Sequence, residues 1–394
     1  MVEALEEMKR TRTLRQRQRL FAGAVRFFAR LELLIDRVVW GLRRRFGRLG
    51  PLQIVTYRGF GTAAQVVLRG RVLEASVLER SLPADSTFRS FRRMLRRFFA
   101  RELPDASVRA QLGASAVAGS TDDEGYFDLS VVSPDLAETD EWKRAEVEVV
   151  GAKVRGLVPV RATAEVLIPG ARAKLGIISD IDDTVLQTHV TQKLKMIWVT
   201  LSGSAFTRMP FEGTSELYHA LARGASGHAG NPVFYVSKSP WNLYDFLVDF
   251  LEHHRLPRGP LLLREIGLHE APPVDHKSAA VQKLLETYPE LPFVLIGDSG
   301  ERDPEIYLET AARYPGRIVA VYIRDLNGKS RNQVAQDRVR TLCERARAYG
   351  TEMLWIEHAS QALSHALDHG LASMQSEPSG PSEPMSQGRL SSPT

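Results

Sequence analysis

The chain has very little cysteine and no long apolar run. Its only cysteine, Cys343, excludes an internal disulfide framework and fits a reducing compartment. No stretch of about 18 apolar residues occurs, so the sequence predicts no membrane-spanning helix. The first twenty residues mix acidic and basic side chains without an apolar centre, unlike a secretory signal. These absences predict a cytoplasmic protein.

Positive charge is concentrated in the N-terminal segment. Residues 1–50 contain 13 Lys or Arg against five acidic residues, a net charge of +8, whereas the whole 394-residue chain carries +5. The remaining residues therefore sum to 5 − 8 = −3. Residues 1–48 lack proline and repeat apolar side chains near helical spacing, which predicts a basic amphipathic helical arm. Such an arm either contacts an anionic membrane peripherally, at its inner surface, or packs on the rest of the protein.

Two different patterns follow this arm. Residues 49–170 contain short β-rich stretches at close spacing, which predict a β-sandwich-like domain with a helical insertion near 87–101. From 171 to 372, strand and helix patterns alternate, which predicts an α/β domain with a Rossmann-like parallel sheet and helices on both faces. Residues 373–394 are rich in Ser, Pro, Gly and Glu, and we expect them to form a disordered tail.

A cluster of acidic residues ends the first predicted strand of the α/β domain. The apolar run from Leu175 to Ser179 leads into Asp180, Asp182 and Asp183. Like charges this close repel each other, so packing does not explain them. A cation or a phosphoryl group does, because cations recruit carboxylate oxygens and assist phosphoryl chemistry. An acidic turn after a strand is the alternative for these three residues taken alone.

Three further segments carry polar side chains to the edge of the sheet where ligands of such folds bind, beyond the carboxyl ends of the strands. They are Ser237-Lys238-Ser239-Pro240-Trp241 and Gly297-Asp298-Ser299-Gly300-Glu301-Arg302-Asp303, each after a predicted strand, and His276-Lys277 at a predicted helix start. Each has an ordinary alternative: a serine in a turn, a solvated lysine, or Asp303 as a helix N-cap before Pro304. Their order and placement together favour a catalytic site.

This order of motifs resembles the haloacid dehalogenase superfamily of phosphotransferases. It is more similar to the actin-patch-associated phosphatidate phosphatases of fungi and their bacterial relatives. The resemblance covers roughly residues 174–330. Two motifs extend it into the β-rich region, Tyr57-Arg58-Gly59-Phe60-Gly61 and Asp122-Asp123-Glu124-Gly125-Tyr126-Phe127. Residues 1–47 are not covered.

The resemblance implies a Mg²⁺-dependent phosphomonoester hydrolase that acts through an aspartyl-phosphate. Asp180 would be the nucleophile, and Asp182 would protonate the leaving alkoxide and then activate water. Thr184 would steady this loop, while Ser237 and Lys277 would bind phosphoryl oxygens.

The resemblance also implies the ligands of the metal and of the substrate. Mg²⁺ would be held by Asp180, Asp182 through its main-chain carbonyl, and Asp298. Asp303 would ligate the ion or support its ligands. The expected substrate-binding residues are Lys238, Ser239 and Ser299.

The substrate is less sharply specified than the chemistry. Only 47 residues, 185–231, separate the first motif from the next strand, which leaves room for a small insertion near 188–209 and predicts an open site. An open site and a basic arm favour a lipid phosphate, most specifically phosphatidate converted to diacylglycerol. The alternatives are the same chemistry on a phosphoprotein or nucleic-acid end, a non-enzymatic phospho-Asp receiver, and an inactive membrane-binding module. We expect no nucleic-acid partner, and the oligomeric state stays open.

Overall fold

The computed structural model describes residues 51–74, 101–132, 142–152, 159–181, 213–264, 275–325 and 333–374. Four predicted features lie outside these residues: the arm at 1–48, the helical insertion at 87–100, the insertion near 188–209 and the tail beyond 374. Arg101, predicted as the last residue of that helix, instead begins a strand, because its backbone pairs with Glu74.

The first part of the chain forms one nine-stranded, mostly antiparallel sheet. Its strands are β1 (Leu52–Thr56), β2 (Gly59–Gly61), β3 (Gln65–Glu74), β4 (Arg101–Glu102), β5 (Ser107–Leu112), β6 (Ser115–Ser120), β7 (Tyr126–Val132), β8 (Lys143–Gly151) and β9 (Val160–Leu167). The strand order is β1-β3-β2-β9-β8-β5-β6, and β4 and β7 also pair with β3.

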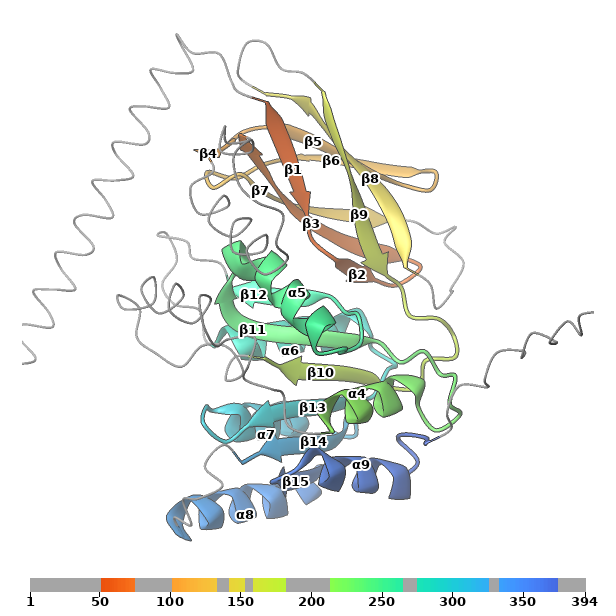
Figure 1. The fold of residues 1–394 in the computed structure, drawn as a ribbon, viewed down its shortest axis with the longest axis vertical. Helices are drawn as coiled ribbons and strands as arrows, with labels where there is room; N and C mark the ends of the chain where they lie inside the picture. Colours follow the sequence, from red (N-terminus) through yellow and green to blue (C-terminus); the bar gives the residue numbers. More distant parts are fainter. Residues whose placement is uncertain are drawn as a thin grey trace, which may run out of the picture.

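This sheet differs from the two separate sheets of a sandwich. The long strand β3 pairs with β1 and β2 and also with β4 and β7. It therefore joins the two layers of strands, which would be separate sheets in a sandwich, into one sheet. β3 runs through Gly70, where the Phe127 ring lies against the backbone: a Cβ there would come within 2.3 Å of that ring. These two layers face each other around one apolar core (Figure 1).

The second part of the chain forms a six-stranded parallel sheet. Its strands are β10 (Gly176–Asp180), β11 (Val233–Pro240), β12 (Leu261–Arg264), β13 (Phe293–Asp298), β14 (Ile318–Arg324) and β15 (Glu352–Ile356). The order is β12-β11-β10-β13-β14-β15. Counted from β10, this is the 3-2-1-4-5-6 order of doubly wound α/β sheets, in which the order reverses direction beside the first strand. Here that point lies between β10 and β13.

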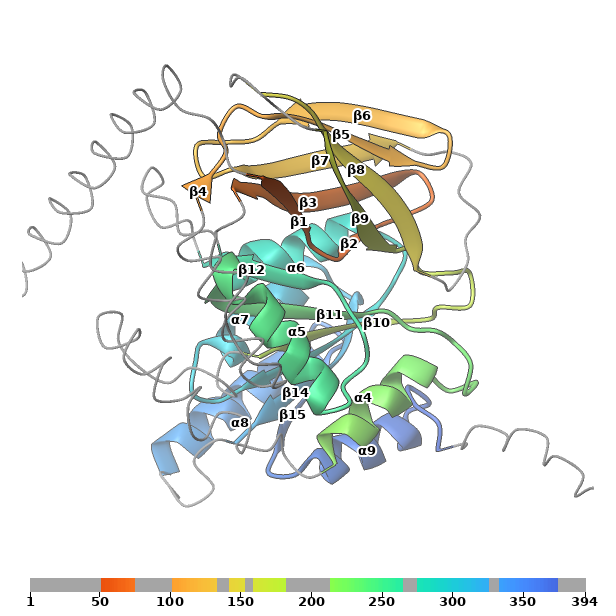
Figure 2. The same ribbon diagram turned by 45° about the horizontal axis from the view of Figure 1, so that its top comes forward.

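Helices cover both faces of the parallel sheet, as the sequence predicts (Figures 1 and 2). They are α4 (Thr214–Arg223), the short 3₁₀ helix η3 (Trp241–Leu243), α5 (Tyr244–His253), α6 (His276–Thr287), α7 (Asp303–Arg313), α8 (Gln333–Arg347) and α9 (Ala359–Asp368). Successive residues of one strand face opposite sides. Thus Ile177 packs in the core with α4, α5 and α9, whereas Ile178 packs with α6, α7 and α8. Among the described helices, none is long and apolar enough to cross a membrane.

Aromatic side chains join the two sheets. Tyr57, just after β1, has its ring centroid 4.4 Å from that of Trp241 and 4.7 Å from that of Tyr244. The backbone N–H of Arg58 donates to the Tyr244 hydroxyl at 2.9 Å. The buried Arg71 of β3 donates to the side-chain oxygen of Asn242 at 2.8 Å. Two motifs that are far apart in the sequence, at 57–61 and 237–241, therefore meet beside the parallel sheet.

Candidate active site

Two aspartates flank the point where the strand order reverses. Asp180 ends β10 and Asp298 ends β13, and the two strands pair in parallel. Asp180 is also in register with Val236 of β11, which places Ser237 one residue beyond it. Parallel strands end at the same edge, so the residues predicted from separate motifs do come together there. Asp182 and Thr184 lie outside the described residues.

Lys277 is the centre of the polar contacts at this edge. Its side chain is fully buried, and its ammonium lies 3.0 Å from Oδ1 of Asp180. The same nitrogen contacts Oε2 of Glu301 at 3.2 Å and Oδ1 of Asp303. Burial alone would lower the pKa of Lys277, but the charges of these carboxylates outweigh it and raise the pKa well above its usual value. Lys277 is therefore held as a permanent buried cation against the predicted nucleophile.

The start of α6 positions this lysine. Asp275, the N-cap, has φ of 22° and accepts a hydrogen bond from the backbone N–H of Lys277 at 3.4 Å. The cap fixes the first turn of the helix, from which the Lys277 side chain reaches Asp180. The alternative interpretation of Lys277, as a solvated lysine at a helix start, is thus wrong.

Asp303 links the lysine to the end of β13. It is the first residue of α7, after Arg302 as N-cap, so the alternative interpretation of Asp303 as the N-cap is wrong. One of its oxygens accepts from Lys277, and the other accepts from the backbone N–H of Asp298 at 3.1 Å. Burial raises the pKa of Asp303 above its usual range, against the opposing charge of Lys277. These contacts make Asp303 a rigid connection between α7, α6 and β13.

Gly297 provides the space for that connection. A Cβ at this position would lie 2.3 Å from Oδ2 of Asp303 and 2.8 Å from the Tyr307 ring. Any larger residue would displace Asp303 from the backbone of Asp298. The glycine of the Gly-Asp motif is therefore required by packing.

The loop after β13 turns around the Asp298 side chain. Its Oδ1 accepts hydrogen bonds from the backbone N–H groups of Gly300, at 2.7 Å, and Glu301, at 3.2 Å. Ligand oxygens of Asp180, Asp298 and Asp303 all lie within 4.8 Å of one another. An all-oxygen group of this kind suits a hard cation such as Mg²⁺.

Glu301 is a site residue whose role sequence reasoning missed, although it stands in the quoted motif. Its Oε2 accepts from Lys238 at 2.6 Å and from Lys277 at 3.2 Å. Burial would raise its pKa, but the two ammonium groups lower it below the usual value. The Lys238 side chain, 39% exposed, is bound by Glu301 at the rim of the site. Lys238 and Lys277 thus share one carboxylate oxygen of Glu301.

The predicted serines of the site lie at the carboxyl ends of β11 and β13, the two strands that flank β10. Ser237 and Ser239 are buried at the end of β11, and the Ser237 hydroxyl accepts from the backbone N–H of Ser239 at 3.0 Å. Ser299 is half-buried, and its backbone N–H donates to the carbonyl of Arg324 at 2.9 Å. Ser237 therefore stabilises the last residues of β11, beside Asp180.

A chain of hydroxyl groups fixes the backbone at Asp180. The Tyr218 hydroxyl of α4 lies 2.6 Å from that of Ser179, which in turn donates to the carbonyl of Asp180 at 3.0 Å. Burial raises the pKa of Tyr218 to about 12, so its hydroxyl keeps its proton and can donate to Ser179. Tyr218 is a second residue absent from the sequence prediction.

A largely apolar pocket adjoins the two aspartates. Asp180, Asp298 and Arg324 lie on its wall beside the apolar side chains of Leu217, Phe250, Leu256, Ile296 and Ile356. Arg324 ends β14 in register with Asp298. Arg324 was not among the predicted site residues, although a polar residue that ends an apolar strand is the same sequence signal that marks Asp180 and Asp298. The pocket therefore combines charged groups with an apolar wall.

Comparison with known proteins identifies the segment that carries this cluster. Residues 175–325 match the catalytic domain of phosphatidate phosphatase APP1. This segment starts just before β10, ends just after β14 and contains every described residue of the predicted site. Phosphatidate phosphatase APP1 of Saccharomyces cerevisiae is 31% identical over 155 residues, which are 38% of this chain and 26% of the yeast protein.

Other matches add little to the APP1 match. An uncharacterized protein of Schizosaccharomyces pombe is 29% identical over 212 residues, 52% of this chain and 34% of that protein. The chain thus aligns with about a third or less of these curated relatives. A carbohydrate acetylesterase from Xanthomonas citri aligns with 78% of this chain and 70% of its own, at 10% identity and a TM-score of 0.30, too low to support any conclusion.

Proposed function

We propose that this protein is a Mg²⁺-dependent phosphomonoester hydrolase of the haloacid dehalogenase type that dephosphorylates phosphatidate or a related lipid phosphate. The observation that carries the proposal is the buried contact of Lys277 with Asp180 and Asp303, beside Asp298, within the segment similar to the APP1 catalytic domain. A fully buried ammonium among carboxylates is costly to maintain, and it suits a site where phosphoryl charge must be bound.

The donor set supports Mg²⁺ as the cation. Carboxylate oxygens of Asp180, Asp298 and Asp303 lie within 4.8 Å of one another, and Mg²⁺ prefers oxygen ligands of this kind. Asp180 and Asp298 would hold the ion, together with the main-chain carbonyl of Asp182. Asp303, with each oxygen already bound, would orient Lys277 and Asp298. When bound, Mg²⁺ would neutralise charge on the phosphoryl oxygens.

The proposed reaction proceeds in two displacements. A carboxylate oxygen of Asp180 attacks phosphorus, the bond from phosphorus to the ester oxygen breaks, and Asp182 gives its proton to the leaving alkoxide. Asp182 then takes a proton from water, whose oxygen attacks phosphorus and releases phosphate and free Asp180. Lys277 remains charged throughout and stabilises negative charge on the transferred group.

The APP1 match supports a lipid phosphate. The yeast relative is a phosphatidate phosphatase by name. The conversion proposed for this chain is phosphatidate to diacylglycerol.

Phosphate release tests this function. The full chain is assayed with Mg²⁺ on phosphatidate in mixed micelles, on p-nitrophenyl phosphate and on a phosphopeptide. We expect turnover of phosphatidate to exceed that of the others and to vanish in Asp180→Asn. Asp337→Asn, an exposed change on α8, is the matched control and should keep full activity. Preference for the phosphopeptide would contradict the lipid assignment, and full activity of Asp180→Asn would contradict the nucleophile assignment.

We also propose that the basic arm holds the protein peripherally on anionic membranes. Its +8 charge would be attracted to anionic lipid, and salt would screen that attraction. Vesicle flotation of the full chain and of a chain lacking residues 1–48 tests this. The salt-sensitive part of binding to anionic vesicles should disappear with the arm, and equal binding by both chains would refute it.

A further inference from the structure

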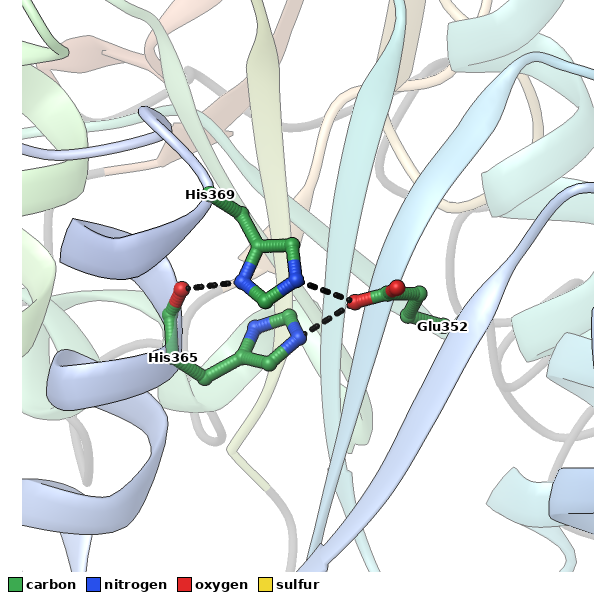
Figure 3. A group of neighbouring side chains, drawn as sticks. All are labelled: Glu352, His365 and His369. Carbon is green, nitrogen blue, oxygen red and sulfur yellow. Dashed lines mark hydrogen bonds and ion pairs between the residues drawn. The ribbon is translucent and has the colours of Figure 1, made fainter.

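Two histidines and a glutamate form a cluster near the start of a strand of the parallel sheet, whereas Asp180 stands at the carboxyl end of its strand. Glu352 is the first residue of β15, whereas the aspartates stand at the ends of their strands. His365 lies in the last turn of α9, and His369 follows that helix as its C-cap. The spacing of four residues places both imidazole rings on one face of the helix, above Glu352 (Figure 3). The APP1 match ends before these residues.

All three side chains converge through the atoms that bind metals. Oε2 of Glu352 lies 2.5 Å from Nε2 of His365 and 3.2 Å from Nε2 of His369. The two rings are stacked, with centroids 4.0 Å apart. Figure 3 shows both ring edges directed at the same carboxylate oxygen. The Nε2 atoms of His365 and His369 thus both lie next to Oε2 of Glu352.

Hydrogen bonds on the far side of each ring orient these atoms. Nδ1 of His369 lies 2.9 Å from the carbonyl of His365, and since a carbonyl only accepts, this nitrogen carries the proton. Nδ1 of His365 lies 3.0 Å from the Tyr322 hydroxyl, which can accept from an Nδ1–H. Metal-binding histidines commonly make such a hydrogen bond with the nitrogen away from the metal.

With Nδ1 of His369 protonated and the ring neutral, the lone pair of Nε2 faces a carboxylate oxygen at 3.2 Å and repels it. A cation between the two atoms relieves that repulsion. It is either a second proton on His369 or one divalent ion bound by all three side chains, and the zinc titration below separates the two.

We infer that Glu352, His365 and His369 form a binding site for a late first-row divalent transition metal, with Zn²⁺ as the representative ion. Two imidazole nitrogens and one carboxylate suit Zn²⁺, Cu²⁺ or Ni²⁺, whereas Mg²⁺ and Ca²⁺ prefer oxygen ligands alone. Three protein ligands leave the remaining position to water or to a further donor. The ion would fasten the C-terminal end of α9 to β15.

The test uses the full, untagged chain in excess Mg²⁺, which would occupy the proposed site of Asp180 and Asp298. Isothermal titration with Zn²⁺ should show one additional ion per chain. His369→Ala and Glu352→Gln should each weaken that binding by more than about 100-fold, because both remove a ligand rather than an outer partner. Tyr322→Phe should weaken it by about 10- to 100-fold, as loss of an outer partner does. His228→Ala, an exposed histidine elsewhere, should bind Zn²⁺ like the unmodified chain.

A second measurement keeps the test independent of folding defects. His369 is about half-exposed, and His369→Ala should keep its circular dichroism and its phosphatase activity. Zn²⁺ should raise the melting temperature of the unmodified chain and of His228→Ala, but not that of His369→Ala. Absence of Zn²⁺ binding, or equal binding by folded His369→Ala, would overturn the metal site and leave the three residues as an ion-paired cluster.

Discussion

The buried ammonium of Lys277 allows a quantitative test of the site's electrostatics. Replacing Lys277 by Met keeps most of the side-chain volume but leaves Asp180, Glu301 and Asp303 without their shared cation. Removing one partner of a buried ion pair typically costs about 3–5 kcal/mol, because the remaining charge is uncompensated. We therefore expect Lys277→Met to lose about 3–5 kcal/mol of unfolding free energy.

Lys238 offers a matched control at the same carboxylate oxygen. It contacts Oε2 of Glu301 at 2.6 Å, closer than Lys277 does, yet its side chain is 39% exposed. Solvent-exposed ion pairs contribute about 0–1 kcal/mol. Lys238→Met should accordingly cost no more than about 1 kcal/mol, although its contact with Glu301 is the shorter of the two.

Urea denaturation of the three proteins, in EDTA and at low salt, measures the difference. Both variants should unfold with the same denaturant dependence as the unmodified chain, so that midpoint shifts report stability. Equal destabilisation by the two substitutions would refute the conclusion that burial decides the strength of these contacts. Lys277→Met should also lose phosphatase activity, because the buried ammonium that stabilises negative charge on the transferred group would be gone.

Three further changes test other parts of the structure. Gly297→Ala should cost about 1–3 kcal/mol of unfolding free energy and most of the activity, because the new methyl group displaces Asp303. Gly151→Ala is the control, because its Cβ would meet only ordinary contacts. Equal stability of the two variants in urea would contradict the packing role of Gly297. Tyr57→Ala should cost about 3–5 kcal/mol of unfolding free energy, since it removes the ring packed on Trp241 and Tyr244. Tyr57→Phe keeps the ring and should retain most of the stability. Thermal unfolding measures both variants, and similar losses would show that the ring contacts matter little. Asp298→Asn keeps an oxygen for the N–H groups of Gly300 and Glu301 but loses the negative charge. It should therefore raise the Mg²⁺ concentration needed for half-maximal activity. An unchanged Mg²⁺ dependence would exclude Asp298 as a metal ligand.

The parallel sheet was predictable because its strands are buried on both faces. Strands such as β13 appear in the sequence as unbroken apolar runs that end in a polar residue, and the position of Asp298 follows from that ending. The antiparallel sheet was harder to predict. Strands β2, β4 and β6 have no clear sequence pattern, because the first two have three and two residues and the third is rich in small side chains.

The contacts between site residues were only partly predictable. The motifs predicted that Asp180, Lys277 and Asp298 approach one sheet edge. That Asp303 binds Lys277 depends on how α6 and α7 lie side by side, and that Glu301 bridges two lysines depends on the turn around Asp298. The cluster of Glu352, His365 and His369 joins a strand start to a helix end, and no single motif contains all three.

The most direct test of the proposed chemistry is to trap the phosphorylated enzyme. The full chain is mixed with phosphatidate and Mg²⁺, quenched with acid during turnover, digested, and analysed by mass spectrometry. A phosphoryl group on the side chain of Asp180, absent from Asp180→Asn, is the predicted result. Steady phosphate release with no phosphoryl group on Asp180, or with one on another residue, would contradict the assignment of Asp180 as the nucleophile.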